Sequence, residues 1–237
     1  MRHPKKILSV LYRCAFYALC FADAAVLTAQ EVPDRTDALG ISVGGGSTFA
    51  HTDFQWTKGV PSPATSIGIH YYSIDFLSIV LDAQKGLLKG GAPLSDGDHS
   101  KTGFENRYYA FSLLFRFTPF ALAGQSKDDG VLKALSSFYG GTGVGYMVSA
   151  VKANNIPNAA YGSQLRYNGG NLLLPLELGL HFKVARIAEA QLFVDINWRT
   201  NICFSDQLDG YVPTVAANRY KDAFSTCTGS LIYKFGW

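Results

Sequence analysis

The sequence contains little cysteine and little methionine. Its 237 residues include 4 Cys and 2 Met. Cys14 and Cys20 lie near the N-terminus, so only Cys203 and Cys227 would remain after removal of a leader. Two cysteines are too few for a disulfide-based scaffold, even in an oxidising compartment.

The chain has no net charge once residues 1–29 are set aside. Its formal net charge is +3, but residues 1–29 hold four basic residues and one acid, which leaves 17 basic and 17 acidic residues from 30 onward. A nucleic-acid-binding protein needs a basic field that neutralises phosphates. We therefore expect no nucleic-acid partner.

Long hydrophobic runs are missing after the N-terminus. No stretch from residue 30 onward reaches the roughly 18 consecutive apolar residues that indicate a transmembrane helix. Lipid cannot hydrogen-bond an unpaired backbone, so only a closed barrel would remain as a way to span a membrane.

The N-terminus has the layout of a secretory signal peptide. Basic residues precede an apolar run over residues 7–21 that only Arg13 interrupts, and small residues follow. Cleavage fits after Ala24 or after Ala29; we adopt the second site, which leaves the polar leader QEVPDRTD. The prediction is a signal peptide over 1–29 and one exported domain over 30–237.

Large apolar side chains recur at every second position in eight segments. Successive side chains of a strand point to opposite faces, so this period predicts strands. The clearest segment is RYYAFSLLFRF, in which Tyr109, Phe111 and Phe115 share one face, and Ala110 and Ser112 the other. The predicted strands are 38–50, 65–72, 76–84, 107–117, 138–148, 171–182, 190–200 and the C-terminal segment 230–237.

The links between these segments alternate in length. Links 73–75 and 183–189 are short, and 118–137 is an exception in which DDGVLKALSS predicts two helical turns on the periplasmic side. The long polar links are 51–64, 85–103, 151–170 and 203–222. Short turns at one end and long loops at the other are typical of outer-membrane barrels.

The side chains on the second face of the strands are mostly small and of mixed polarity, which suits a narrow barrel interior. Bulky members such as Leu114, Leu173, Phe193 and Ile232 favour a packed interior over an open channel. Charged members of a filled interior ordinarily pair with one another. We predict a polar network in the lumen made of Asp82, Arg116, Glu177, His181, Asp195, Asn197 and Arg199.

The last residues, SLIYKFGW, place four large apolar side chains on one face: Leu231, Tyr233, Phe235 and Trp237. This pattern resembles the C-terminal signal of Gram-negative outer-membrane proteins. The resemblance implies recognition by the barrel-assembly machinery during insertion.

Several longer stretches extend the resemblance over residues 38–237. They are YYSIDFLSIVLD, SFYGGTGVGYM, NLLLPLELGL, LFVDINWRTNICFSDQLDGY and SLIYKFG. They resemble small outer-membrane β-barrel proteins of the Bacteroidetes type, similar in architecture to eight-stranded OmpA and OmpX barrels. The resemblance implies an all-β, closed, antiparallel up-and-down transmembrane barrel in the cell outer membrane, in contact with its lipid. The chain departs from the pattern by adding Trp237, and no peptidoglycan-binding domain follows.

Glycine runs and histidines do not form a recognisable site in the sequence. The runs 44–46 and 140–145 lack the lysine and hydroxyl residue of a phosphate loop. The histidines are scattered without ligand spacing, and the adjacent Asp98, His99 and Ser100 do not resemble a triad, whose members converge from separate elements. We expect no catalytic, cofactor or metal site.

The alternation of side chains between the two faces of a strand also separates the two remaining cysteines. Cys203 falls in the inward set and Cys227 in the outward set, whereas directly paired residues share a face. We predict two separate thiols.

The favoured function is a non-enzymatic outer-membrane barrel with a structural, adhesive or accessory role. Its contact surfaces for an extracellular or membrane protein partner would be the external loops 51–64, 85–103, 151–170 and 203–222. A small porin or transporter of apolar molecules is the alternative, and a lipid-modifying barrel enzyme a third hypothesis.

Overall fold

Eight antiparallel strands make up the fold of the computed structural model. The model describes residues 38–52, 60–74, 76–91, 103–121, 135–154, 164–187, 189–205, 208 and 222–235. The strands are β1 (Ala38–His51), β2 (Ser62–Ile74), β3 (Leu77–Gly91), β4 (Gly103–Phe117), β5 (Phe138–Asn154), β6 (Gln164–Ile187), β7 (Ala190–Cys203) and β8 (Ala223–Lys234).

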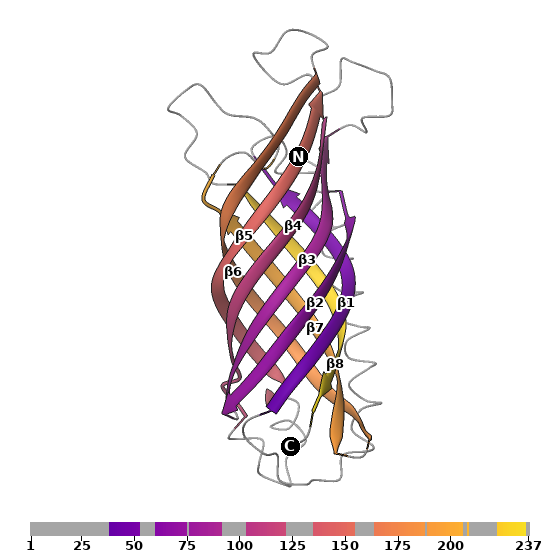
Figure 1. Cartoon of the computed structure of the whole chain (residues 1–237), viewed down its shortest axis with the longest axis vertical. Helices are drawn as coiled ribbons and strands as arrows, with labels where there is room; N and C mark the ends of the chain where they lie inside the picture. The colour runs from indigo at the N-terminus through magenta and orange to yellow at the C-terminus, as the bar shows by residue number, and fades with distance from the viewer. Residues whose placement is uncertain are drawn as a thin grey trace, which may run out of the picture.

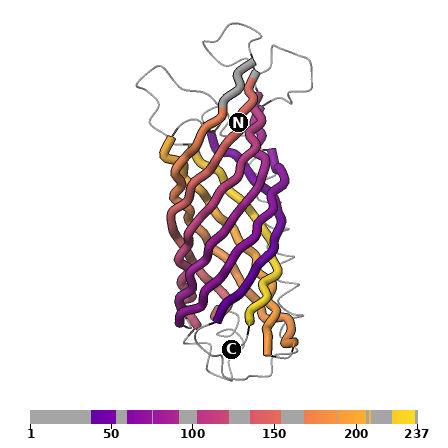
Figure 2. The backbone as a smooth tube through the Cα atoms, in the orientation of Figure 1, coloured from indigo at the N-terminus to yellow at the C-terminus, as the bar shows by residue number. Residues whose placement is uncertain are grey.

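The strands form a closed ring in chain order (Figures 1 and 2). Each strand pairs with its sequence neighbours, and β8 returns to β1 with a register that runs from Gly40 opposite Lys234 to His51 opposite Ala223. The predicted all-β fold, a closed antiparallel up-and-down barrel of eight strands, is confirmed. No helix within the described residues is long and apolar enough to cross a membrane.

Several predicted strand limits were wrong. β3 and β4 run to Gly91 and from Gly103, and β5 and β6 to Asn154 and from Gln164, so the predicted loops 85–103 and 151–170 are partly strand. The predicted loops 51–64 and 203–222 likewise lose His51, Ser62 to Ala64 and Cys203 to β1, β2 and β7. These residues continue the backbone pairing but are polar or glycine-rich, so they carry no apolar alternation that sequence analysis could detect.

The C-terminal strand was misplaced for the same reason. β8 begins at Ala223 and ends at Lys234, rather than covering 230–237. Its first half contains Ser225, Thr226 and Thr228, which pair with β1 and β7 without large outward side chains. Trp237 lies outside the described residues.

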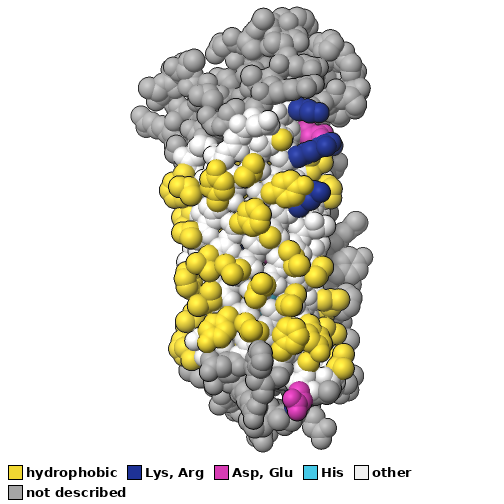
Figure 3. Space-filling view, viewed as in Figure 1, with side chains coloured by type: hydrophobic (Ala, Val, Ile, Leu, Met, Phe, Trp, Pro, Cys, Tyr) yellow, Lys and Arg dark blue, Asp and Glu magenta, His cyan; other side chains and the backbone are white. Residues whose placement is uncertain are grey.

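The two faces of the ring have opposite character. Outward side chains are large and apolar, such as Val43, Leu81, Phe111 and Val144, each more than half exposed. Figure 3 shows hydrophobic side chains spread along the barrel wall on the face in view. Inward Val80, Leu114, Leu173 and Ile232 are almost fully buried. The predicted apolar exterior and packed interior are therefore confirmed.

The link 118–137 begins and ends at the same barrel end as the β2–β3 turn. The Thr118 amide donates to the Phe76 carbonyl at 2.9 Å, and the His181 amide to the Ser137 carbonyl at 2.9 Å. Residues 122–134 lie outside the described residues, so most of the helix expected there stays a prediction.

Two glycines provide a test of how closely the ring is packed. A Cβ on Gly143 would collide with the backbone carbonyl of Leu113 on β4, whereas a Cβ on Gly229 would meet nothing within 4 Å. We expect Gly143→Val to lower the free energy of unfolding by about 1–3 kcal/mol, the usual cost of overpacking. Gly229→Val should leave it unchanged or raise it, because valine favours strands. Urea unfolding in detergent micelles measures both; equal destabilisation would contradict the register.

Candidate functional site

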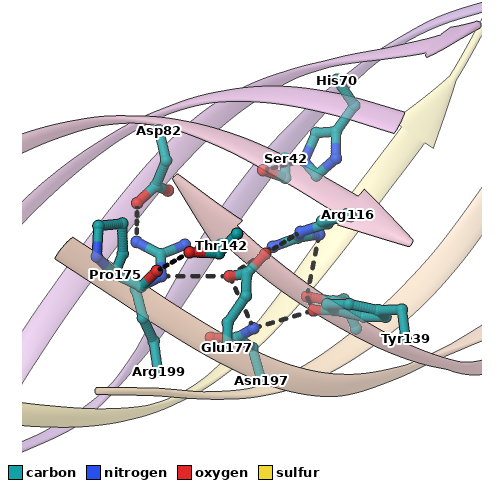
Figure 4. Close-up of polar contacts among 11 residues, drawn as sticks. Ser42, His70, Asp82, Arg116, Tyr139, Thr142, Pro175, Glu177, Asn197 and Arg199 are labelled. Carbon is teal, nitrogen blue, oxygen red and sulfur yellow. Dashed lines mark hydrogen bonds and ion pairs between the residues drawn. The ribbon is translucent and has the colours of Figure 1, made fainter. Parts of the chain in front are cut away.

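The most elaborate polar site described is a buried ion-pair network inside the barrel, centred on Glu177 (Figure 4). The Glu177 carboxylate accepts hydrogen bonds from Arg116 Nε at 2.6 Å, Arg199 Nε at 3.2 Å and Asn197 Nδ2 at 3.1 Å. All these side chains are buried. One carboxylate thus joins guanidinium groups from β4 and β7.

Two further acids complete the network. Arg199 forms an ion pair with Asp82 on β3, and Arg116 Nη1 lies 3.9 Å from Asp195 Oδ2. Tyr139 donates to Asp195 at 3.1 Å, and the Arg116 guanidinium lies 4.5 Å from the centre of its ring. Buried charges are tolerated only where they are paired in this way.

Strand register explains why these distant residues meet. Arg116 pairs with Gly141, Gly141 with Glu177, and Glu177 with Arg199, so four neighbouring strands carry the row side by side. Gly141 has no side chain, and a Cβ there would crowd the Glu177 carboxylate. Glycine at this position therefore lets Arg116 and Glu177 reach each other across β5.

Six of the seven predicted lumen residues enter this network, and the seventh lies beside it. His181 pairs with Asp195 in register, and its ring centre lies 5.9 Å from those of Tyr139 and Phe193. Sequence analysis missed Tyr139 as a partner. Tyr139 shares the inward face of β5 with Gly141, but its contacts with Asp195 and Arg116 depend on the register between strands, which the sequence does not show.

A histidine–serine pair, also missed, lies next to the network. His70 Nε2 and Ser42 Oγ are 2.9 Å apart, a distance at which a histidine can activate a hydroxyl. The pair is buried, and the neighbouring cavity, lined by His70, Arg116, Tyr139 and His181 among others, has a volume of about 50 Å³. That volume suits a water molecule or two but not a lipid or sugar substrate.

Apolar side chains fill the interior toward the long-loop end. Their cluster includes Leu88, Phe104, Tyr108, Met147, Cys203 and Phe224. Leu208, from the link between β7 and β8, is fully buried among them. Its carbonyl accepts from Asn106 Nδ2 at 2.8 Å, and its amide donates to Asp222 Oδ2 at 2.9 Å. A residue of a predicted external loop therefore closes part of the interior.

The two cysteines lie on opposite faces, as parity predicted. Cys203 belongs to the buried interior cluster, and Cys227 pairs with the outward Trp198. The structure places neither of them in a disulfide bond. Within the described ranges, no group of three or more His, Cys, Asp or Glu side chains is placed to hold a metal ion.

No family model matches the chain, and no curated protein matches it. Among solved structures, it is similar to Neisserial surface protein A (12% identity, TM-score 0.44, covering 84% of this chain and 97% of the other). It is similar to Ail of Yersinia pestis in complex with the heparin analogue sucrose octasulfate (13%, TM-score 0.44, covering 85% and 100%). A third similarity is to OprG from Pseudomonas aeruginosa (14%, TM-score 0.41, covering 85% and 98%). Likenesses this distant do not establish a shared role.

The network predicts a large difference between two Glu→Gln substitutions. Glu177→Gln removes the carboxylate between two buried arginines, and we expect a loss of about 3–5 kcal/mol in the free energy of unfolding. Glu105→Gln makes the same chemical change at an exposed ion pair, and we expect a change within about 0.5 kcal/mol. Reversible urea unfolding in lipid vesicles tests both. A loss for Glu177→Gln as small as that for Glu105→Gln would show that the buried pairs are not stabilising.

Proposed function

We propose that the chain is an integral outer-membrane β-barrel with a structural, adhesive or accessory role and no enzymatic activity. The observation that carries this proposal is the combination of a closed ring, an apolar outer wall and an interior filled by side chains. A soluble barrel with this wall would expose far more contiguous apolar surface than soluble proteins tolerate.

The dimensions of the wall support membrane insertion. A tilted strand needs about 9–11 residues to cross a bilayer, and the strands here have 12 to 24. Aromatic side chains favour membrane interfaces. Phe117 and Tyr233 lie near the short-turn end, and Tyr109 is the last large apolar side chain on the outward face of β4 before Arg107 and Glu105 at the long-loop end.

The filled interior supports a non-channel role over the alternative of a porin or transporter. The Glu177 network occupies one level of the lumen, and the cluster around Leu208 occupies another. An open pore would need both layers to move aside, at the cost of breaking buried ion pairs.

The same interior argues against a lipid-modifying enzyme. The His70–Ser42 pair has suitable spacing but faces a cavity of about 50 Å³. A cavity of this size cannot hold a lipid substrate.

The chain ends have proposed roles in export and assembly. Residues 1–29 would be the signal peptide, and they lie outside the described residues. Leu231, Tyr233 and Phe235 lie partly exposed along the outward face of β8 and its end, where they would be available to the barrel-assembly machinery.

The long-loop end would be the contact surface for ligands or protein partners. Most of the predicted loops 51–64, 85–103, 151–170 and 203–222 lies outside the described residues. The strands β3 to β6 extend beyond the apolar wall at this end.

Membrane insertion predicts heat-modifiable migration. A closed barrel resists cold dodecyl sulfate, so the unheated membrane fraction should run as a compact, faster band that shifts to about 26 kDa or slightly below after boiling. Purification of the protein from the soluble fraction, with no difference between heated and unheated samples, would contradict the proposal.

The packed lumen predicts the absence of steady conductance. We expect no stable open steps from the purified protein in a planar bilayer at 1 M salt, with a known porin measured alongside as a positive control. Regular steps of uniform size would favour the porin alternative, because a filled eight-stranded barrel leaves no continuous water path.

A further inference from the structure

The outer face of the barrel carries a basic cluster directly above the apolar wall. Lys85 and Lys89 come from β3, Arg107 from β4 and Lys152 from β5, all on the long-loop side. Figure 3 shows Lys and Arg side chains gathered at the upper edge of the hydrophobic wall, beside an acidic side chain. Register makes them neighbours: Lys89 pairs with Glu105, and Glu105 with Lys152.

Among the described side chains of this cluster, cations outnumber carboxylates. Glu105 contacts both Lys89, at 3.3 Å, and Arg107, at 3.4 Å, so one carboxylate is shared by two cations. Lys85 instead lies over the Tyr109 ring, 5.4 Å from its centre. The Arg107 side chain remains 73% exposed. These cations are therefore open to an anion from outside the barrel.

An apolar groove lies immediately below the cluster on the same wall. It has a volume of about 450 Å³ and is lined mainly by Ile67, Ile69, Leu81, Ala83, Phe111 and Leu113. The small Ala83 lies between Ile67 and Phe111 in register, which leaves the wall hollow at this point. Ala83 and Lys85 share a face of β3, about 7 Å apart along the strand.

We propose that this face of β2 to β5 is a binding site for a phosphate-bearing membrane lipid. An acyl chain would occupy the groove over Ala83, and the phosphate would contact Lys85, Lys89 and Arg107. Guanidinium and ammonium groups at a membrane surface are suited to lipid phosphates. A soluble polyanion would use the cluster alone, so the adjoining groove favours a lipid. The inference rests on the proposed membrane insertion.

The test uses the folded protein in neutral detergent and lipid A, a doubly phosphorylated glycolipid, as the probe. Native mass spectrometry would count bound lipid and yield its dissociation constant. We expect the wild type to bind lipid A at least tenfold more tightly than chemically dephosphorylated lipid A, and inorganic phosphate at millimolar concentration not to displace it. Equal affinity for the two lipids would overturn the proposal, as would full displacement by phosphate or by a soluble sulfated polysaccharide.

Variants test the assigned residues. The triple variant K85Q/K89Q/R107Q should bind lipid A at least tenfold more weakly, since each interfacial cation contributes to phosphate attraction. The control K183Q/R186Q/K234Q removes three cations at the opposite barrel end and should stay within twofold of the wild type. Equal affinity of the first triple variant and the wild type would overturn the assignment of the cluster.

The groove needs its own pair of variants. Ala83→Leu fills the hollow and should weaken lipid A binding about threefold or more, whereas Gly229→Leu adds the same side chain at an outward position elsewhere and should not. If the two variants bind lipid A with equal affinity, the acyl chain does not occupy the groove over Ala83. Cold dodecyl sulfate migration of every sample separates the hypotheses: a wild type that does not form a barrel contradicts the proposed function, whereas folded proteins with equal binding contradict only the lipid site.

Discussion

Closure of the β1–β8 seam is the constraint on which the rest of the structure depends. Pairing from Gly40–Lys234 to His51–Ala223 gives the first and last strands a partner on both sides. A closed ring has no sheet edge whose amides and carbonyls need water. The outer wall can therefore be apolar, because the backbone makes its hydrogen bonds within the ring.

Closure also determines what the interior can hold. Eight strands leave a lumen just wide enough for side chains, and here it is divided between the Glu177 ion-pair network and the apolar cluster around Leu208. Pairing offsets the cost of burying the charges, and Gly141 supplies the space that the central carboxylate needs. Under the proposed function, the outer wall would be the principal surface for interaction with lipid, and the long-loop end the one for other partners.

Much of the fold could be predicted from a period of two. Alternation in segments such as 107–117 identified the outward Phe111 and the inward Ser112, and the same parity separated Cys203 from Cys227. Strand ends beyond the apolar wall carry no such signal, so β6 begins at Gln164 rather than at residue 171. Parity lists the inward residues but not their partners, which depend on register. Tyr139 was missed for that reason. Leu208 was missed because it lies in the predicted loop 203–222, where the sequence carries no strand alternation.

The central claim is that hydrocarbon surrounds the apolar face of every strand. Spin labels placed one at a time at positions 109 to 116 of β4, in lipid vesicles and without Cys203 and Cys227, measure it most directly. The barrel predicts a period of two, with 109, 111, 113 and 115 reached by dissolved oxygen but not by a water-soluble nickel complex, and the intervening positions shielded from both. Access of the nickel complex to the odd-numbered positions would contradict the account.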